Sequence, residues 1–274
     1  MDWNIGVVGT GVMAETMIAG LREEGTEGAR ILASHRRPDR LRFLEDRYGV
    51  RTTLSNAEAA QADLVVLAVK PQTLPGVLAE LRGKIPEKSI LLSIVAGARM
   101  RLLQDCTGHS RVVRSMPNLP CRIRKGMTVW CAPAEVSATE RARIQAVLRV
   151  MGEEVSVEEE EHVDRATAVS GTGPAIVAHF VKAYLEAAAY VGLPRAVARQ
   201  TVLATLQGTV EMLRASDGHV AELIDEVTSP GGTTTRALQV LKNGRFSAVL
   251  TESVEGAYLR SRELGDALEA RVRR

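Results

Sequence analysis

The stretch GVVGTGVMAETM, residues 6–17, decides the fold of the first half of the chain. It joins a short β-branched run, residues 4–8, to a helical pattern over residues 13–24 whose apolar side chains share one face. Between them, Gly9-x-Gly11-x-x-Ala14 fits the glycine fingerprint of a dinucleotide-binding turn. There the first glycine permits a tight turn, the second lets a pyrophosphate approach, and the small third residue lets the helix pack on the strand. The alternative is an ordinary glycine-rich turn. The residues of this region predicted to bind cofactor are Gly6, Gly9, Thr10, Gly11, Val12 and Met13.

Working outward, short apolar or β-branched runs recur through the first half and alternate with helical patterns. They predict strands over residues 4–8, 30–34, 62–69, 89–95, 111–115 and 127–131. The run ADLVVLAV, residues 62–69, is apolar almost throughout, as expected of a parallel strand covered on both faces. This alternation indicates an α/β domain with a Rossmann-type doubly wound parallel sheet, which we place at residues 1–162.

The pattern changes after the acidic tract EEVSVEEEEH, whose last glutamates, residues 158–161, indicate a solvated strand end or a linker. From residue 163 onward the predicted elements are helices, over residues 174–191, 194–215, 219–227, 234–242 and 246–270. Their faces are rich in Ala and Gly and poor in aromatic residues, so they cannot build a separate core without a partner chain. We therefore expect residues 163–274 to form an all-α domain through which the chain makes a homodimer.

The composition excludes several classes of protein. The 274 residues suggest about two domains, and 45% apolar with 25% charged residues fits a globular protein. A net charge of +2 without a basic, aromatic-interleaved stripe argues against nucleic acid binding. Three widely spaced cysteines indicate a reduced, cytoplasmic protein, and without an apolar run of 18 residues we expect no membrane span. The five histidines lack metal-ligand spacing, so we expect no metal and interpret them as structural or exposed.

The end of the second predicted strand indicates which nicotinamide cofactor binds. Strands in NAD-binding sheets usually end there with a carboxylate that accepts from the ribose 2′-hydroxyl. Here the sequence reads ASHRRPDR, residues 33–40, with no carboxylate before Asp39. Ser34, Arg36 and Arg37 offer a hydroxyl and two guanidinium groups, which suit a 2′-phosphate. The sequence thus predicts NADPH, with NADH as a possible second cofactor; the alternative for Arg37 is a solvated charge at a helix start.

A second glycine-rich stretch, VTSPGGTTTRALQVL, covers residues 227–241. Paired glycines expose backbone N–H groups and threonines add hydroxyl donors at an expected helix N-terminus, where unpaired donors and the positive dipole end suit a small carboxylate. The alternative is a threonine N-cap before an ordinary helix.

Six motifs occur in order along the chain: the GxGxxA turn, Ala68-Val69-Lys70-Pro71, Ser93-Ile94-Val95-Ala96-Gly97, Met116-Pro117-Asn118, Ser170-Gly171-Thr172-Gly173-Pro174-Ala175 and Ser229-Pro230-Gly231-Gly232-Thr233-Thr234. Together they resemble the pyrroline-5-carboxylate reductases, which catalyse the last step of proline biosynthesis. The likeness covers essentially the whole chain, and its most specific element is SPGGTT with the following Ala237, Leu238 and Leu241.

The resemblance implies a Rossmann-type domain and an intertwined helical dimerisation domain, active sites that draw on both chains, and further assembly of dimers into rings. It implies that Asn56 contacts the adenosine ribose and that Ala68, Val69, Lys70, Pro71, Val95, Ala96 and Gly97 line the nicotinamide half. It further implies that the backbone of Gly231, Gly232, Thr233 and Thr234 holds the substrate carboxylate. The hydroxyl of Thr234, the catalytic candidate, would meet the ring nitrogen of a cyclic imine, with no metal or covalent nucleophile required.

Some positions depart from the family pattern. Val12 stands where Asn is usual, Ala14 where Gly is frequent, Leu119 where Thr is common, Thr172 for Ser and Ile176 for Tyr. These departures leave open a related cyclic imino acid as the substrate.

Two further functions were weighed. β-Hydroxyacid dehydrogenases resemble one another in a helix lysine four residues after a G-x-G, but that count from Gly173 reaches Val177, and the next lysine is Lys182. A non-catalytic relative acting as a binding or regulatory module is disfavoured by the intact glycines and threonines at both sites.

Overall fold

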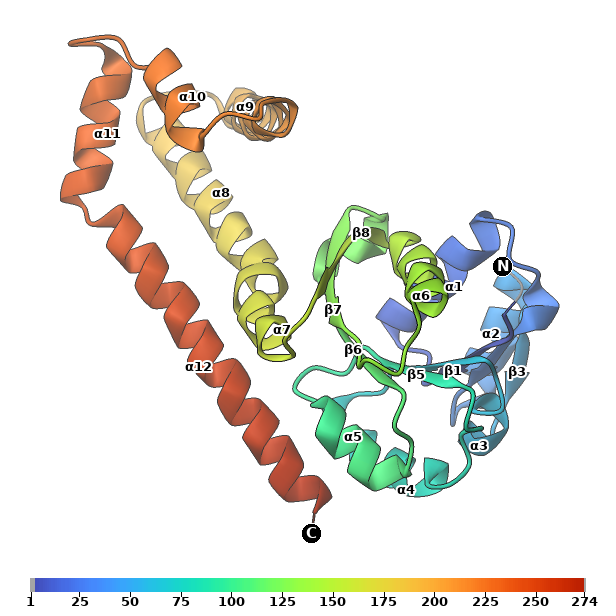
Figure 1. Ribbon diagram of the computed structural model, residues 1–274. Coiled ribbons are helices and arrows are strands. Elements are labelled where there is room, and N and C mark those ends of the chain that lie inside the picture. The colour runs from blue at the N-terminus through green and yellow to red at the C-terminus, as the bar shows by residue number, and fades with distance from the viewer. Residues whose placement is uncertain (1–2, 274) are drawn as a thin grey trace. The chain divides into compact units, whose positions relative to one another are not determined.

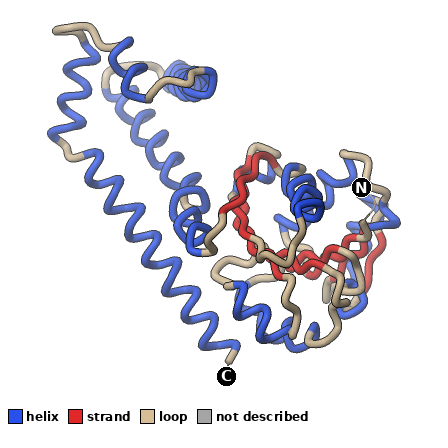
Figure 2. The backbone as a smooth tube through the Cα atoms, in the orientation of Figure 1, coloured by secondary structure: helices blue, strands red, loops and turns tan. Residues whose placement is uncertain are grey.

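A computed structural model describes residues 3–273 and, within them, a single eight-stranded sheet in the order β3-β2-β1-β4-β5-β6-β7-β8 (Figures 1 and 2). The strands are β1 Ile5–Val8, β2 Ile31–Ser34, β3 Arg51–Thr53, β4 Leu64–Leu67, β5 Ile90–Ser93, β6 Val112–Pro117, β7 Gly126–Cys131 and β8 Gly152–Val157. Neighbouring strands are parallel except β6 and β7. Strand order reverses at β1, which lies between β2 and β4, and a crevice at such a switch point is where open α/β sheets bind ligands.

Helices cover both faces of the sheet because each central strand is apolar on both sides (Figure 1). In β4, Leu64 and Val66 pack in one core and Val65 and Leu67 in the other. The first core is closed by α1 Val12–Glu23, α2 Pro38–Tyr48 and α6 Ala138–Arg149. The second is closed by α3 Asn56–Ala59, α4 Leu74–Leu81, α5 Met100–Thr107 and the end of α12 Phe246–Val272.

These elements confirm the predicted fold class, and all six predicted strands are present. β3, β8 and α7 Glu161–Ala166 were not predicted, and the prediction of a wholly parallel sheet is wrong at β7, which is antiparallel to β6. The glutamates 158–160 follow β8 directly, and Glu161 opens α7.

The chain forms two compact units. The first runs to Thr172 and resumes at Ala257, and the second is Gly173–Gly256. The division into a nucleotide-binding domain of residues 1–162 and a helical domain of residues 163–274 stays a prediction. The second unit holds α8 Gly173–Tyr190, α9 Arg195–Ala215, α10 Val220–Glu226, α11 Thr233–Asn243 and the start of α12.

The second unit buries few apolar side chains: Ala188, Ala198 and Val202 are its buried hydrophobic residues. Large apolar side chains such as Val177, Val191 and Val227 are more than half exposed. An apolar surface of this extent is typical of a protein–protein interface. Among residues 3–273, no helix combines the length and apolarity needed to cross a membrane.

Candidate functional site

The glycine-rich turn after β1 forms an uncapped helix start. Gly9 has a φ of +87°, a conformation that side-chain-bearing residues rarely adopt, and a Cβ there would lie 2.6 Å from Val69 Cγ1. Gly11 is the N-cap of α1 and supplies no side-chain hydrogen bond, and a Cβ placed on it would meet nothing within 4 Å. The first amides of α1 therefore face open space at the positive end of the helix dipole, which suits a pyrophosphate.

Thr10 is 2% exposed, and its hydroxyl oxygen has no hydrogen-bond partner among the described residues. A buried hydroxyl without a partner carries a free-energy cost that a bound ligand would remove. This orphaned group, the uncapped helix and the space at Gly11 fit a dinucleotide phosphate.

Three residues of the turn region contribute differently. Gly6 is buried in β1, where a Cβ would lie 1.7 Å from the Ala59 carbonyl oxygen, so its small size allows α3 to approach the strand. Met13 packs against the first core. Val12 is 54% exposed and lines a hollow of about 620 Å³ beside the turn. Gly6 and Met13 thus do not line the pocket described next.

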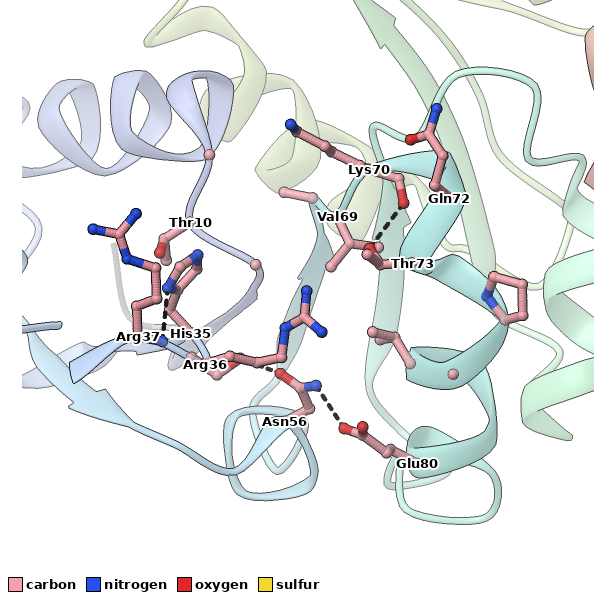
Figure 3. Close-up of a pocket in the computed structure, with 17 residues that line it drawn as sticks. Thr10, His35, Arg36, Arg37, Asn56, Val69, Lys70, Gln72, Thr73 and Glu80 are labelled. Carbon is pink, nitrogen blue, oxygen red and sulfur yellow. Dashed lines mark hydrogen bonds between the residues drawn. The ribbon is translucent and has the colours of Figure 1, made fainter. Parts of the chain in front are cut away.

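A pocket of about 750 Å³ opens at the switch point, beside the turn (Figure 3). It brings together the predicted cofactor residues Gly9, Thr10, Gly11, Ser34, Arg36, Arg37, Asn56, Ala68, Val69 and Lys70. The sequence reading missed the other lining residues, His35, Gln72, Thr73, Pro75, Gly76, Val77 and Glu80. Most of these lie on η2 Pro71–Thr73 and α4, which carry no motif.

A chain of hydrogen bonds fixes the floor of this pocket. Ser34, fully buried at the end of β2, donates to Asn56 Oδ1 at 2.7 Å, and Asn56 Nδ2 donates to Glu80 Oε2 at 2.6 Å (Figure 3). The Ser34 hydroxyl is thereby engaged within the protein, which leaves the Asn56 amide between β2 and α4 as the polar group of the floor.

The basic residues after β2 differ in their partners. Arg37 is paired with Asp39, and Arg40 binds Glu15 at 2.5 Å and donates to the Thr10 carbonyl at 3.1 Å. Arg36 has no hydrogen-bond or ion-pair partner among the described residues, and its side chain extends into the pocket over Asn56 (Figure 3). Burial raises the pKa of Glu15, but hydrogen bonds from Arg40 and Tyr48 lower it more, so this carboxylate stays ionised.

His35 lies between these arginines and lines the pocket, so the interpretation of all histidines as only structural or exposed missed it. Its Nδ1 accepts a hydrogen bond from the Arg37 amide at 3.1 Å. Burial and then the positive charges of Arg40, Arg37 and Arg36 lower its pKa. A neutral His35 therefore carries its proton on Nε2.

The remaining predicted nicotinamide residues follow β4 and β5 at the carboxyl edge of the sheet. Pro71 begins η2 behind Lys70, whose carbonyl accepts from the Thr73 hydroxyl at 3.0 Å. Val95 is buried, Ala96 is exposed and Gly97 has a φ of +74°. Val95, Ala96 and Gly97 do not line the 750 Å³ pocket, which opens over β1, β2 and β4.

The predicted substrate loop precedes α11. Gly232, not a threonine, is the N-cap of this helix, and it makes no side-chain cap. Gly231 has a φ of +71°, and the Thr235 hydroxyl donates to the Ser229 carbonyl at 2.7 Å. Thr233 is exposed and Thr234 half-buried, and the Thr234 hydroxyl has no hydrogen-bond partner among residues 3–273. The Gly232 amide donates to the Ser229 carbonyl at 3.0 Å, whereas the amides of Thr233 and Thr234 have no partner among residues 3–273 and can bind an anion.

Comparison with known proteins matches each half of the chain to a family and the whole chain to pyrroline-5-carboxylate reductases. The family described as pyrroline-5-carboxylate reductase dimerisation matches residues 160–264, and the family described as NADP oxidoreductase coenzyme F420-dependent matches residues 4–97. A pyrroline-5-carboxylate reductase of Synechocystis is 38% identical over 97% of this chain and 99% of its own.

Solved structures agree in fold and extent. A pyrroline-5-carboxylate reductase from Coxiella burnetii has a TM-score of 0.91 and 34% identity, with 96% of this chain and 99% of that chain covered. A Plasmodium falciparum pyrroline carboxylate reductase with NADP bound has a TM-score of 0.84 and 28% identity, with 96% and 98% covered. The match of residues 160–264 to the dimerisation family identifies the helical half as a self-association domain.

Proposed function

The chain belongs to the pyrroline-5-carboxylate reductase family, and we propose that it catalyses the NADPH-dependent reduction of 1-pyrroline-5-carboxylate to L-proline, the last step of proline biosynthesis. The observation that carries this proposal is that a glycine is the N-cap of both α1 and α11, so that no side chain covers either helix start. The start of α1 suits a pyrophosphate, and the start of α11 suits a small carboxylate.

The cofactor half of the proposal rests on the pocket at the switch point. The Thr10 hydroxyl and the amides of α1 hold the pyrophosphate, Asn56 contacts the adenosine ribose, and Arg36 with Arg37 holds the 2′-phosphate. A nicotinamide extending from there over β4 and β5 reaches Ala68–Pro71 and the loop that follows β5, residues 94–99. NADPH supplies the hydride, which moves from C4 of its nicotinamide to the imine carbon.

The substrate half rests on the loop before α11. The loop of residues 231–234 binds the carboxylate through the backbone N–H groups that have no partner in the chain, which include those of Thr233 and Thr234, and its small side-chain bulk leaves the ring face open to the hydride. The Thr234 hydroxyl donates to the ring nitrogen, which gains a proton from solvent as the C=N bond becomes C–N. The protein contributes orientation and this hydrogen bond.

The self-association is proposed in finer detail as a homodimer through the helical half, which assembles further into rings of dimers. The exposed apolar side chains of α8 to α12 support the dimer. In this proposal the α11 loop of one copy completes the nucleotide pocket of the other.

A steady-state assay with the purified protein tests the reaction. NADPH consumption is followed with 1-pyrroline-5-carboxylate, with its six-membered homologue and with 1-pyrroline, which lacks the carboxylate. We expect the highest kcat/KM for the first and the lowest for the last, because only the anion uses the α11 amides. Preference for the six-membered ring would move the function to a related cyclic imino acid, the alternative that Val12, Leu119 and Ile176 leave open. If no imine is turned over, the proposed reductase activity is refuted.

A further inference from the structure

The loop that follows β5, residues 94–99, is held in place from two sides. In the proposed function this loop meets the nicotinamide half of the cofactor. Beneath the loop, Ser93 Oγ accepts from the Val95 amide at 3.2 Å, and the Ser115 hydroxyl donates to the Ser93 carbonyl at 3.0 Å. Both serines are at most 1% exposed. The start of the loop is therefore anchored to β5 and β6.

The end of the loop is held by the C-terminal part of α12. A Cβ on Gly97 would lie 3.4 Å from the Cα and N of Gly265, and a Cβ on Gly265 would lie 3.4 Å from the Gly97 carbonyl oxygen. Helix and loop thus approach closely at two glycines, and the φ of +74° at Gly97 is one that side-chain-bearing residues rarely adopt.

Two ion pairs and a core contact fix the same end. Arg99 binds Asp266 at 2.7 Å and Glu269 at 3.5 Å, both on α12. Leu268, 6% exposed, packs in the core that also holds Val95 and Ala98. Tyr258, earlier on the helix, donates to Glu161 of α7 at 2.6 Å.

We propose that the C-terminal segment of α12, through Gly265 and Arg99, positions the loop of residues 94–99 against the nicotinamide half of the cofactor. This inference rests on the proposed function, because it takes the loop to meet the nicotinamide. Gly265 and Arg99 are positioning residues and touch neither substrate nor cofactor. Sheet topology supports the placement, since the adenosine end lies over β2 and the loop follows β5, on the other side of the switch point.

The test separates the two halves of the cofactor. Affinities for NADPH and for 2′,5′-ADP, which carries only the adenosine half and its 2′-phosphate, are measured by calorimetry on the full-length protein. In Gly265→Ala the new methyl lies 3.3 Å from the Arg99 guanidinium and 3.4 Å from the Gly97 carbonyl, so the guanidinium must move by a few tenths of an ångström against its partners on α12. The matched control, Gly256→Ala on the same helix, places its methyl where nothing lies within 4 Å.

Arg99→Ala provides a second variant, and Arg101→Ala, an exposed arginine two residues away, is its control with the same change of charge. We expect Gly265→Ala and Arg99→Ala to weaken NADPH binding roughly fivefold and to lower kcat about tenfold, while 2′,5′-ADP affinity stays within about twofold. Arg99→Lys should recover part of the rate.

Equal losses for NADPH and 2′,5′-ADP, or variants that match their controls, would overturn the positioning role. A fold defect is recognised by a loss of 2′,5′-ADP binding together with an earlier melt, and also counts against it. Failure of the proposed function is a separate result, because the unmodified protein would then not consume NADPH with the imine.

Discussion

At the scale of the residue, Arg36 and Arg37 are adjacent but electrostatically unequal. Asp39 neutralises Arg37 in a solvent-exposed ion pair, whereas the Arg36 guanidinium is free in the pocket among the described residues. A phosphate recruits the free cation more readily, because Arg37 would first have to leave its carboxylate. From the sequence alone, both arginines were predicted to bind the 2′-phosphate, without a difference between them.

Arg36→Ala should therefore raise the KM for NADPH more than Arg37→Ala does, and neither should much affect the KM for NADH. Losing one charge-assisted phosphate contact of roughly 1.5–3 kcal/mol predicts an increase of about ten- to a hundredfold for Arg36→Ala. Steady-state kinetics with both cofactors measures this. Equal effects on NADPH and NADH would remove the 2′-phosphate role, and an unmodified protein that prefers NADH would remove the specificity itself.

Thr234 supports a prediction about the mechanism. A hydrogen bond of roughly 1.5–3 kcal/mol expressed in the transition state implies that Thr234→Ala slows kcat by about ten- to more than a hundredfold. Thr234→Ser should recover much of the rate. Because Gly232 is the N-cap of α11, the Ala variant should also melt close to the unmodified protein. A melting curve and a rate on one sample test both; a folded Thr234→Ala enzyme with unchanged kcat would exclude the catalytic role.

At the scale of the element, the amino ends of β4, β5 and β6 are joined through polar groups. The Ser89 hydroxyl donates to the Ala62 carbonyl at 2.7 Å, and His109 Nε2 donates to the Ser89 carbonyl at 2.9 Å. Burial, followed by the charge of Arg111, lowers the pKa of His109. The unfolded chain therefore binds a proton that the folded chain does not, so this group's contribution to stability is full above pH 6.5 and is lost as pH falls below it.

Replacement of His109 by Gln keeps a donor for the Ser89 carbonyl and removes the titration. We expect the free energy of unfolding to fall less between pH 7.5 and pH 5.5 in His109→Gln than in the unmodified protein, because the variant has no buried imidazole whose pKa is lowered on folding. His35, whose pKa is also lowered, leaves part of the dependence in place. Urea unfolding at the two pH values measures the free energy of unfolding of each protein. His179→Gln, which replaces an exposed histidine, is the control. Parallel losses in all three proteins would contradict the assignment.

Some of the secondary-structure elements could be predicted from the sequence and others could not. The strands around the switch point and the five helices α8 to α12 were predicted, because apolar or helical patterns mark them in the sequence. β3 is a three-residue edge strand, and β8 reads GEEVSV, so both lack the apolar run that marks a buried strand. The antiparallel direction of β7 depends on the short connection through η3 Leu119–Ile123, which local patterning does not reveal.

The pocket residues that the sequence proposed, such as Gly9, Gly11 and Arg36, are those that a glycine motif or a cluster of charges marks. His35, Thr73 and Glu80 belong to no motif, and only the fold brings them to the pocket. The packing role of Gly6 against α3 also required the tertiary structure, since the same glycine fits the turn fingerprint.

At the scale of the whole molecule, the proposed sharing of the active site between copies predicts complementation. Gly11→Asp places a carboxylate at the pyrophosphate position with no clash, because a Cβ there meets nothing within 4 Å. Thr234→Ala impairs the other half of the site. Differently tagged copies are co-expressed and the mixed dimer is purified. One of its two sites is then intact and the other carries both changes, so we expect about half of the wild-type rate.

If each active site is built from a single chain, every site in the mixed dimer carries one defect. The rate of the mixed dimer then does not exceed that of the Thr234→Ala and Gly11→Asp homodimers. Light scattering should show at least a dimer at low micromolar concentration. A stable, active monomer would end the proposal that the helical half needs a partner.

Isotope transfer tests the proposed reaction, in which hydride passes from NADPH to the imine carbon of 1-pyrroline-5-carboxylate. The protein is incubated with the imine and NADPH that carries deuterium at both C4 positions, and the product is examined by mass spectrometry and NMR. We expect proline with a single deuterium at C5, the carbon of the former C=N bond. Proline without deuterium, or NADPH oxidation without proline, would contradict it.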